Sequence, residues 1–409
     1  MKKSSKCLLL ILVCLGLLFL SVLPAAGAES GDAGLTPEPA APVIETDVEQ
    51  VDKYGNLVLK ISGSGLLAQG YDYGDIISAS MLGRDLEMPV VSDYWDVDVG
   101  DYLCILRIDK AKGQDEAQIS INMLDIVTEL GIAAKVDTNE DPGFRWQYQV
   151  PLPFEVTVSL KEKGGYAREY ELHHLSRTNR REDYPDLTDE QYANFRPVTT
   201  TGVGKGTLYR SSSPVDPQLN RNKEADEALN NAGVRTVMNL ADTGKAMRGY
   251  EDYATSYYSQ RDVIPLGMSL NFYTDAFRTK LAEGLIFFST HEGPYLVHCT
   301  EGKDRCGFVS ALLECLMGAS AEEVIADYMV TYRNYFGVEP GTEKYDVLAR
   351  GNIEKTLSRV FGTEDIRQAD LSQCAADYLH SLGLSDETVA ALKKNLAAGQ
   401  EDAPSGENP

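Results

Sequence analysis

Two patterns of hydrophobic positions divide the chain. Between about residues 46 and 172, apolar and polar residues alternate in short runs such as LVLKIS, DIISASML, DYLCILRI, AQISINM and FEVTVSL, with Gly or Asp between the runs. Alternation with a period of two is typical of half-buried strands. We therefore predict a smaller β-rich domain here. It contains no nucleophile beside a base, and its role stays open.

From about residue 196 the pattern changes to strands alternating with helices. The runs TLYRSSSP, VRTVMNLAD and YLVHC predict strands. The segments NKEADEALNNAG, YTDAFRTKLAEGLIFFSTH, GFVSALLECLMG and AEEVIADYMVTYRNYF predict helices, and residues 370–397 predict two more. This alternation predicts an α/β domain with a central, mostly parallel sheet flanked by helices.

The chain ends and junctions predict the domain limits. Residues 1–28 combine a basic start, an apolar stretch from Cys7 to Leu23 and the small residues Ala26-Gly27-Ala28, which is typical of a cleaved signal peptide. An uncleaved membrane anchor is the alternative. The remaining expected segments are a flexible linker (29–45), the β-rich domain (46–172), a connector (173–195), the α/β domain (196–398) and a disordered tail (399–409). A cleaved signal implies a secreted or cell-surface protein without a transmembrane segment.

Three features resemble binding sites without meeting their requirements. The sequence GVGKGT at 202–207 resembles the end of a nucleotide-binding loop, but Thr199 stands where that pattern needs Gly. His173 and His174 are adjacent, so they do not share a face, and no third metal ligand is close in sequence. The nearby arginines are expected to be a solvated loop: Arg177, Arg180 and Arg181.

Charge and cysteine content narrow the function. The chain has 62 acidic and 38 basic residues and a net charge of −24, which signal cleavage would bring to about −27. Nucleic acid is therefore not an expected partner, because phosphate contacts need a basic face, and any phosphate site must be local. The cysteines beyond residue 28 are odd in number, so at least one thiol should be free: Cys104, Cys299, Cys306, Cys315 and Cys374.

The candidate chemistry lies in the sequence LVHCTEGKDRCGF at 296–308. The apolar run should carry Cys299 to the carboxyl end of a buried strand, and a helix should begin just past Arg305. We call residues 299–305 the cysteine loop. A tight strand–loop–helix turn points its amides at an anion, here from Thr300, Glu301, Gly302, Lys303, Asp304 and Arg305. Gly302 permits the backbone angles that the turn needs.

A phosphate held in this loop would lie over the sulfur. Arg305 can grip two phosphate oxygens, and the positive field of the loop favours the thiolate of Cys299. In-line attack then gives a cysteinyl-phosphate that water hydrolyses, without a metal or cofactor. Asp304 is the expected general acid, Lys303 a rim charge suited to a second phosphate, and His298 a hydrogen-bonding partner of the loop. The simpler alternative is a surface loop of ion pairs around a buried cysteine.

The order His-Cys-x-x-Gly-Lys-Asp-Arg resembles the signature of the bacterial tyrosine-protein phosphatase family, whose members depend on a cysteine. The segments NFRPVTTTGVGKGTLYRSSSP, GVRTVMNLAD and DYMVTYRNYF are similar too, so the resemblance covers roughly residues 190–395. It implies a dual-specificity-like phosphotyrosine and phosphoinositide monoesterase, with Cys299 as nucleophile, Asp304 as acid and Arg305 as phosphate clamp. Lys303 would favour inositol phosphates. Arg210 would either support the loop or be a structural buried arginine.

One position departs from the family pattern. Thr or Ser usually follows the arginine, and here the residue is Cys306, whose thiol is a weaker donor. Cys306 could also trap Cys299 as a reversible disulfide, or simply be a small packing residue. Cys315 and Cys374 are expected in the core. The fallback acids upstream of the cysteine loop are Asp242, Asp262 and Asp275.

Several functions stay open at this stage. The leading one is a secreted phosphomonoesterase acting on phosphotyrosine, phosphoinositide or soluble inositol phosphate. The second is a catalytically inactive phosphate-binding module that docks a partner through its β-rich domain. The third is a sulfurtransferase, which also uses a cysteine loop over a strand.

Overall fold

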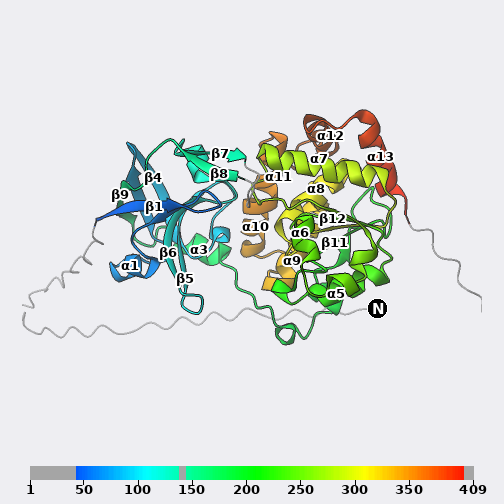
Figure 1. The fold of residues 1–409 in the computed structure, drawn as a ribbon, viewed down its shortest axis with the longest axis horizontal. Helices are drawn as coiled ribbons and strands as arrows, with labels where there is room; N and C mark the ends of the chain where they lie inside the picture. Colours follow the sequence, from blue (N-terminus) through cyan, green and yellow to red (C-terminus); the bar gives the residue numbers. More distant parts are fainter. Residues whose placement is uncertain (1–42, 138–143, 400–409) are drawn as a thin grey trace, which may run out of the picture. The chain divides into compact units, whose positions relative to one another are not determined.

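The alternating runs of the first half form a closed barrel of seven strands (Figure 1). The computed structural model describes residues 43–137 and 144–399, which lie in one compact unit. The strands follow one another around the barrel in the order β1 (Ile44–Val51), β2 (Leu57–Leu59), β6 (Gln114–Ile121), β5 (Tyr102–Asp109), β4 (Arg84–Val91), β3 (Ile76–Met81) and β9 (Phe154–Glu162). Their inward side chains make a core of their own, from Val48 to Val158.

Part of the domain prediction lies outside the described residues. The expected signal peptide, most of the linker and all but the first residue of the tail fall there. Strand β1 begins at Ile44, so the last two residues assigned to the linker are part of the barrel. Within 43–137 and 144–399, no helix is both long and apolar enough to cross a membrane.

The second half is an α/β domain, which confirms the predicted fold class. Its sheet has the order β10 (Arg196–Pro197), β11 (Leu208–Ser211), β14 (Tyr295–His298), β12 (Thr236–Asn239) and β13 (Asp262–Pro265). All neighbours are parallel except β10 and β11. Strand β14 is central and fully buried, as expected for a parallel strand covered on both faces.

Helices cover both faces of this sheet. On one face, Leu296 and Val237 lie in a core with α5 (Asn222–Asn231) and α6 (Gly244–Arg248). On the other, Val297 and Met238 meet the larger core of α7 (Asp275–Thr290), α8 (Asp304–Met317), α9 (Ala321–Phe336), α12 (Leu371–Ser381) and α13 (Asp386–Ala397). Successive strand residues point to opposite faces, so each strand serves both cores.

Some elements gave no clear signal in the sequence. Strand β13 and the helices α10 (Glu343–Ala349) and α11 (Lys355–Phe361), which flank a π-helical stretch (Arg350–Glu354), were not predicted. These last elements contact the barrel half: the carbonyl of Gly351 accepts from the amide of Val99 at 3.0 Å, and Lys355 pairs with Asp101 at 2.8 Å. Residues 202–207, which resemble the end of a nucleotide-binding loop, lie in a turn between β10 and β11.

Helix α8 approaches α9 closely at Gly307. A β-carbon there would lie 2.5 Å from the ring of Tyr328 and 3.1 Å from a guanidinium nitrogen of Arg210. We expect Gly307→Ala to lower the free energy of unfolding by about 1–3 kcal/mol, because the ring cannot move within the core. Gly284→Ala in α7 is the matched control, since its β-carbon meets the ends of flexible side chains, Leu266 and Met238, at 2.9 Å. Urea unfolding of both variants checks this, and an equal loss in the two would contradict it.

Candidate active site

The cysteine loop lies at the carboxyl edge of the parallel sheet. His298, the last residue of β14, is level with Ser211 of β11 and with Asn239 of β12. Loops from three strands therefore meet at this point, where ligands bind in open α/β sheets. Cys299 follows directly and is 2% exposed.

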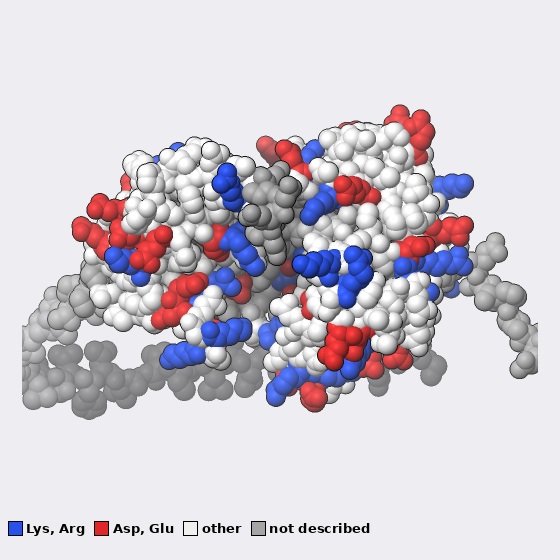
Figure 2. Space-filling view, viewed as in Figure 1, with Lys and Arg blue, Asp and Glu red and all other residues white. Residues whose placement is uncertain are grey.

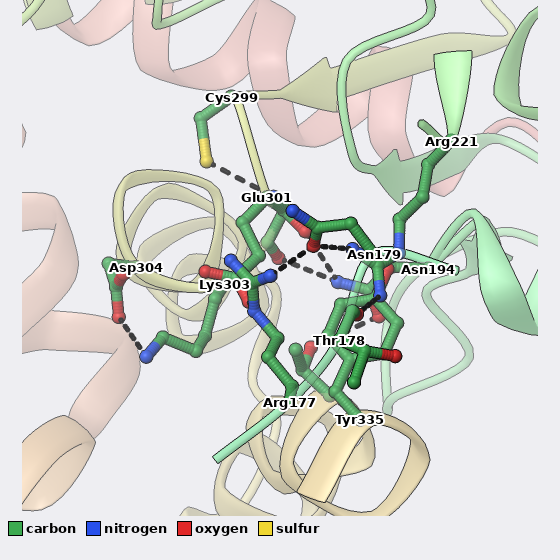
Figure 3. A network of polar contacts seen from close by, with 12 residues as sticks. Arg177, Thr178, Asn179, Asn194, Arg221, Cys299, Glu301, Lys303, Asp304 and Tyr335 are labelled. Carbon is green, nitrogen blue, oxygen red and sulfur yellow. Dashed lines mark hydrogen bonds and ion pairs between the residues drawn. The ribbon is translucent and has the colours of Figure 1, made fainter. Parts of the chain in front are cut away.

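One backbone amide of the cysteine loop points at the sulfur. The amide of Gly302 donates to Sγ of Cys299 at 3.3 Å (Figure 3). Gly302 has φ +76°, and a β-carbon there would lie 2.7 Å from the amide nitrogen of Ser212, so no other residue fits. Among the described residues, no acceptor is recorded for the other amides from Thr300 to Cys306, which leaves them available to an anion.

Arg305 is held at the mouth of this cradle. One of its terminal nitrogens donates to the carbonyl of Met268 at 2.9 Å, and the other donates to Oγ1 of Thr300 at 3.3 Å. Its Nε is buried and has no acceptor among the described residues. A buried donor without a partner is costly, so this nitrogen is a ready contact for a bound oxyanion.

Asp304 is the first residue of α8 and is nearly buried. Burial raises the pKa of its carboxyl to about 6, although the charge of Lys303 opposes this shift. The two side chains are 3.8 Å apart, and Oδ1 of Asp304 has no hydrogen-bond partner. The acid is therefore protonated in mildly acidic solution, as a proton donor must be.

Lys303 is not at the rim, where the sequence placed it. It is 2% exposed, and its Nζ lies 3.7 Å from the ring centroid of Trp95, a residue of the barrel half. Tyr332 and Phe336 of α9 supply two further rings at 5.4 and 5.5 Å. The cation is thus enclosed by aromatic faces, which its charge attracts. Nothing in the local sequence indicated Trp95.

Arg210 supports the loop from below and is also a buried structural arginine, so both alternatives for it apply. It donates to the carbonyl of Gly302 at 3.0 Å and pairs with Asp327 of α9 at 2.5 Å. Burial lowers the pKa of its guanidinium, but Asp327 outweighs this effect and raises it. Asn194 adds a side-chain amide to the carbonyls of Glu301 and Gly302, at 3.2 and 3.1 Å.

The connector segment holds the loop from the outside. Arg177 donates to Glu301 at 2.6 Å (Figure 3). The two side chains are 21% and 16% exposed. Arg177 also bonds Asn179, which accepts from Arg221. The prediction that this arginine belongs to a solvated loop is therefore wrong for Arg177, because its charge is paired inside the site.

The remaining connector residues carry no anion site. Arg180, whose side chain is 73% exposed, pairs with Asp183, and Arg181 pairs with Asp189. His173 contacts Asp98 and His174 contacts Asp96. Among residues 43–137 and 144–399, no three His, Cys, Asp or Glu residues are grouped as a metal site would need.

His298 lies in a buried chain of hydrogen bonds. Burial lowers its pKa to about 4, so the ring is neutral. Nε2 is 2.9 Å from the hydroxyl of Tyr258, and Nδ1 is 3.4 Å from the carbonyl of Cys299. Asn239 donates to the same hydroxyl at 3.0 Å. A Tyr258 hydroxyl that donates to Nε2 leaves the ring proton on Nδ1, facing the Cys299 carbonyl. The sequence indicated neither Tyr258 nor Asn239.

Cys306 fits the packing alternative best. Its thiol donates to the carbonyl of Val297 at 3.2 Å, and burial raises its pKa to about 11. A thiol with a raised pKa is a poor nucleophile for a disulfide with Cys299. All the described cysteines are free, which agrees with the prediction that at least one thiol is free. Cys104, Cys306 and Cys315 are fully buried.

The fallback acids are placed less well than Asp304. Asp242 is buried and occupied, since it accepts from the hydroxyl of Tyr250 at 2.8 Å and from Asn239 at 3.1 Å. Asp262 is the first residue of β13, so it lies at the amino ends of the strands, whereas the cysteine loop lies at their carboxyl ends. Asp275 is an exposed residue in the first turn of α7.

Comparison with known proteins assigns the α/β domain. The sequence profile described as "Tyrosine phosphatase family" matches residues 190–398, half of the chain. The chain belongs to the tyrosine phosphatase family. In this family member the matched residues contain β10 to β14, the cysteine loop and the helices α5 to α13.

Two solved structures are similar to parts of this tyrosine phosphatase family member. An uncharacterized conserved protein from Thermotoga maritima is 18% identical, with 29% of this chain and 36% of that chain covered and a TM-score of 0.22. The core catalytic domain of the PP-IP phosphatase SIW14 from S. cerevisiae, in complex with citrate, is 19% identical, with 41% and 91% covered and a TM-score of 0.26. No curated protein matches the chain. The family assignment therefore rests on residues 190–398.

The raised pKa of Asp304 predicts a pH dependence. A carboxyl that donates a proton must be protonated, so turnover of an alkyl phosphate should fall as the pH rises through about 6. Asp304→Asn should lower kcat for that substrate by about 10²–10⁴. The loss should be smaller for p-nitrophenyl phosphate, whose leaving group departs without a proton. Asp275→Asn, at an exposed acid, is the control. An unchanged alkaline limb in Asp304→Asn would identify another group as the acid.

Proposed function

We propose that the chain is a Cys-dependent phosphomonoesterase that works through a cysteinyl-phosphate. One observation carries this proposal. The sulfur of Cys299 accepts from the amide of Gly302 at 3.3 Å, and the same short loop holds further donors without an acceptor among the described residues: the buried Nε of Arg305 and the other amides from Thr300 to Cys306. An oxyanion of tetrahedral shape satisfies all of them at once, and phosphate has that shape and charge. Membership of the tyrosine phosphatase family agrees with this reading.

In the first step, Sγ of Cys299 attacks phosphorus in line with the leaving oxygen. The S–P bond forms as the P–O bond to the leaving group breaks, and Asp304 gives that oxygen its proton. Arg305 and the loop amides neutralise the charge on the three oxygens that are not exchanged. Catalysis of this kind is positioning plus charge stabilisation.

In the second step, water attacks the phosphorus of the cysteinyl-phosphate. The carboxylate of Asp304 now accepts a proton from that water, the P–O bond forms and the S–P bond breaks. The sulfur leaves as a thiolate, which the amide of Gly302 stabilises at 3.3 Å. Inorganic phosphate then departs, and Asp304 is again protonated for the next turnover.

Three substrate classes fit this chemistry: phosphotyrosine protein, phosphoinositide and soluble inositol phosphate. The cysteine loop binds only the phosphate that is transferred. Lys303 is enclosed by three rings and is not exposed at the rim, so it does not distinguish these classes by contacting a second phosphate there. The choice depends on the surfaces around the loop.

The central test is hydrolysis of p-nitrophenyl phosphate in EDTA with a reducing agent. Cys299→Ser should lower the rate by a factor on the order of 10³ or more, because serine lacks the thiolate. Cys374→Ser, at a half-buried cysteine of α12, is the matched control and should retain activity. Rapid quenching with a ³²P substrate should label the wild-type protein and not Cys299→Ser. Absence of hydrolysis in the wild-type protein would instead favour an inactive phosphate-binding module.

We also propose that the enzyme acts outside the cytoplasm. Support comes from the basic residues Lys2, Lys3 and Lys6, the apolar stretch that follows them and the small residues 26–28. N-terminal sequencing of the protein from its own cells should give a chain that begins at Glu29. A full-length chain in the membrane fraction would instead indicate an uncleaved anchor.

A further inference from the structure

A cavity of about 450 Å³ adjoins the cysteine loop. We call it the barrel cavity; its walls include Lys53, Trp95, Arg107 and Lys135 from the barrel half, and Ser269 and Leu270 from the loop after β13. Two contacts tie it to the active site. Trp95 lies against Lys303, and the carbonyl of Met268, next to Ser269, accepts from Arg305.

The barrel cavity has a charge opposite to that of the whole chain. The described residues of its walls include three cations, Lys53, Arg107 and Lys135, and one acid, Asp125, whereas the chain has a net charge of −24. Acidic and basic side chains are interspersed on the face drawn in Figure 2. A local excess of positive charge beside a phosphate site is therefore unusual for this molecule, and it would attract a second anion of the substrate.

Two of these cations have no anionic partner. Asp125 pairs with Lys135 at 3.3 Å, so these two charges neutralise each other. Neither the ammonium of Lys53 nor the guanidinium of Arg107 makes a hydrogen bond or an ion pair with a described residue, and the Nζ of Lys53 lies 4.8 Å from the ring centroid of Tyr54. Arg107 is half-buried on β5, so its free guanidinium is only partly hydrated.

The acid opposite Arg107 on the neighbouring strand makes no ion pair with it. Glu116 of β6 is its direct cross-strand neighbour. The Glu116 carboxylate instead accepts the side-chain amides of Gln118 at 2.9 Å and Gln114 at 3.4 Å. Arg107 thus keeps its planar donor fork available, and that fork matches two oxygens of a phosphate.

We propose that the barrel cavity is a second phosphate subsite, in which Arg107 and Lys53 bind a further phosphate of a multiply phosphorylated inositol. This inference rests on the proposed function, since the first phosphate lies in the cysteine loop. Trp95 forms the wall between the two sites, and its flat ring can face the carbon-bound hydrogens of the inositol ring. The barrel, whose role the sequence left open, would then select the substrate. The second phosphate would be bound by Arg107 and Lys53, and not by Lys303 as the sequence suggested.

The test compares substrates with one and with several phosphates. Arg107→Gln should lower kcat/KM for inositol 1,4,5-trisphosphate about tenfold more than for p-nitrophenyl phosphate, mainly through KM, because one charge-assisted contact is lost. Arg107→Lys keeps the charge and should recover part of the difference. Arg84→Gln, at an exposed arginine of β4, is the matched control and should change neither value.

Each outcome decides one claim. Equal losses on both substrates would mean that Arg107 acts on stability or on the cysteine loop, and would overturn the subsite. The subsite would also be overturned if Arg107→Gln lowered kcat/KM for an acidic phosphotyrosine peptide and left kcat/KM for the trisphosphate unchanged. If the wild-type protein hydrolyses p-nitrophenyl phosphate without preferring the trisphosphate, the subsite fails and the phosphatase activity stands.

Binding tests the subsite without turnover. Calorimetric titration of inositol 1,4,5-trisphosphate into Cys299→Ser should give a Kd that rises about tenfold when Arg107→Gln is added. An unchanged Kd would overturn the subsite even if the protein proves inactive. Phosphatidylinositol 4,5-bisphosphate in phosphatidylcholine vesicles carries the same ring phosphates, so comparing it with the soluble compound shows whether the natural source is a lipid headgroup or a free inositol phosphate.

Discussion

The site depends on the direction of two peptide groups in the cysteine loop. The amides must face the anion, so the carbonyls of Gly302 and Lys303 must face into the protein, where water cannot solvate them. Arg210 and Asn194 supply the donors that these carbonyls need. Arg210 is itself buried, and Asp327 balances its charge at 2.5 Å. A loop without this support would turn its carbonyls toward the substrate and repel it.

Residues around the cysteine loop also pair with its polar groups. Arg177 neutralises Glu301, whose charge would otherwise lie beside the bound phosphate. Burial lowers the pKa of His298 and keeps its ring neutral below the nucleophile, while Tyr258, which Asn239 supports, contacts the ring nitrogen, so no cation competes with Arg305 for the anion. The carbonyls of Thr300, Glu301, Gly302 and Lys303 all have donors, and the donors left over are those that a phosphate would satisfy. The site is therefore organised before substrate arrives.

The barrel contributes to the site through one aromatic side chain and one charged cavity. Trp95 covers Lys303 and removes it from the rim, while Arg107 and Lys53 line the same cavity as Trp95. A chain with a strongly negative net charge cannot attract a polyanion from a distance. Cations confined to a cavity with low-dielectric walls can still hold one at short range.

The sequence by itself determined the two fold halves, the strand–loop–helix turn and the roles expected of Cys299, Gly302 and Arg305, because periodicity and the choice of glycine act within a few residues. Only the tertiary structure decided that Lys303 is enclosed by Trp95, that Arg177 pairs with Glu301 and that Tyr258 meets His298. Strand β13 and helices α10 and α11 also had no clear local pattern. These contacts join residues far apart in the chain, and a side chain's surroundings depend on packing that no local pattern of polarity records.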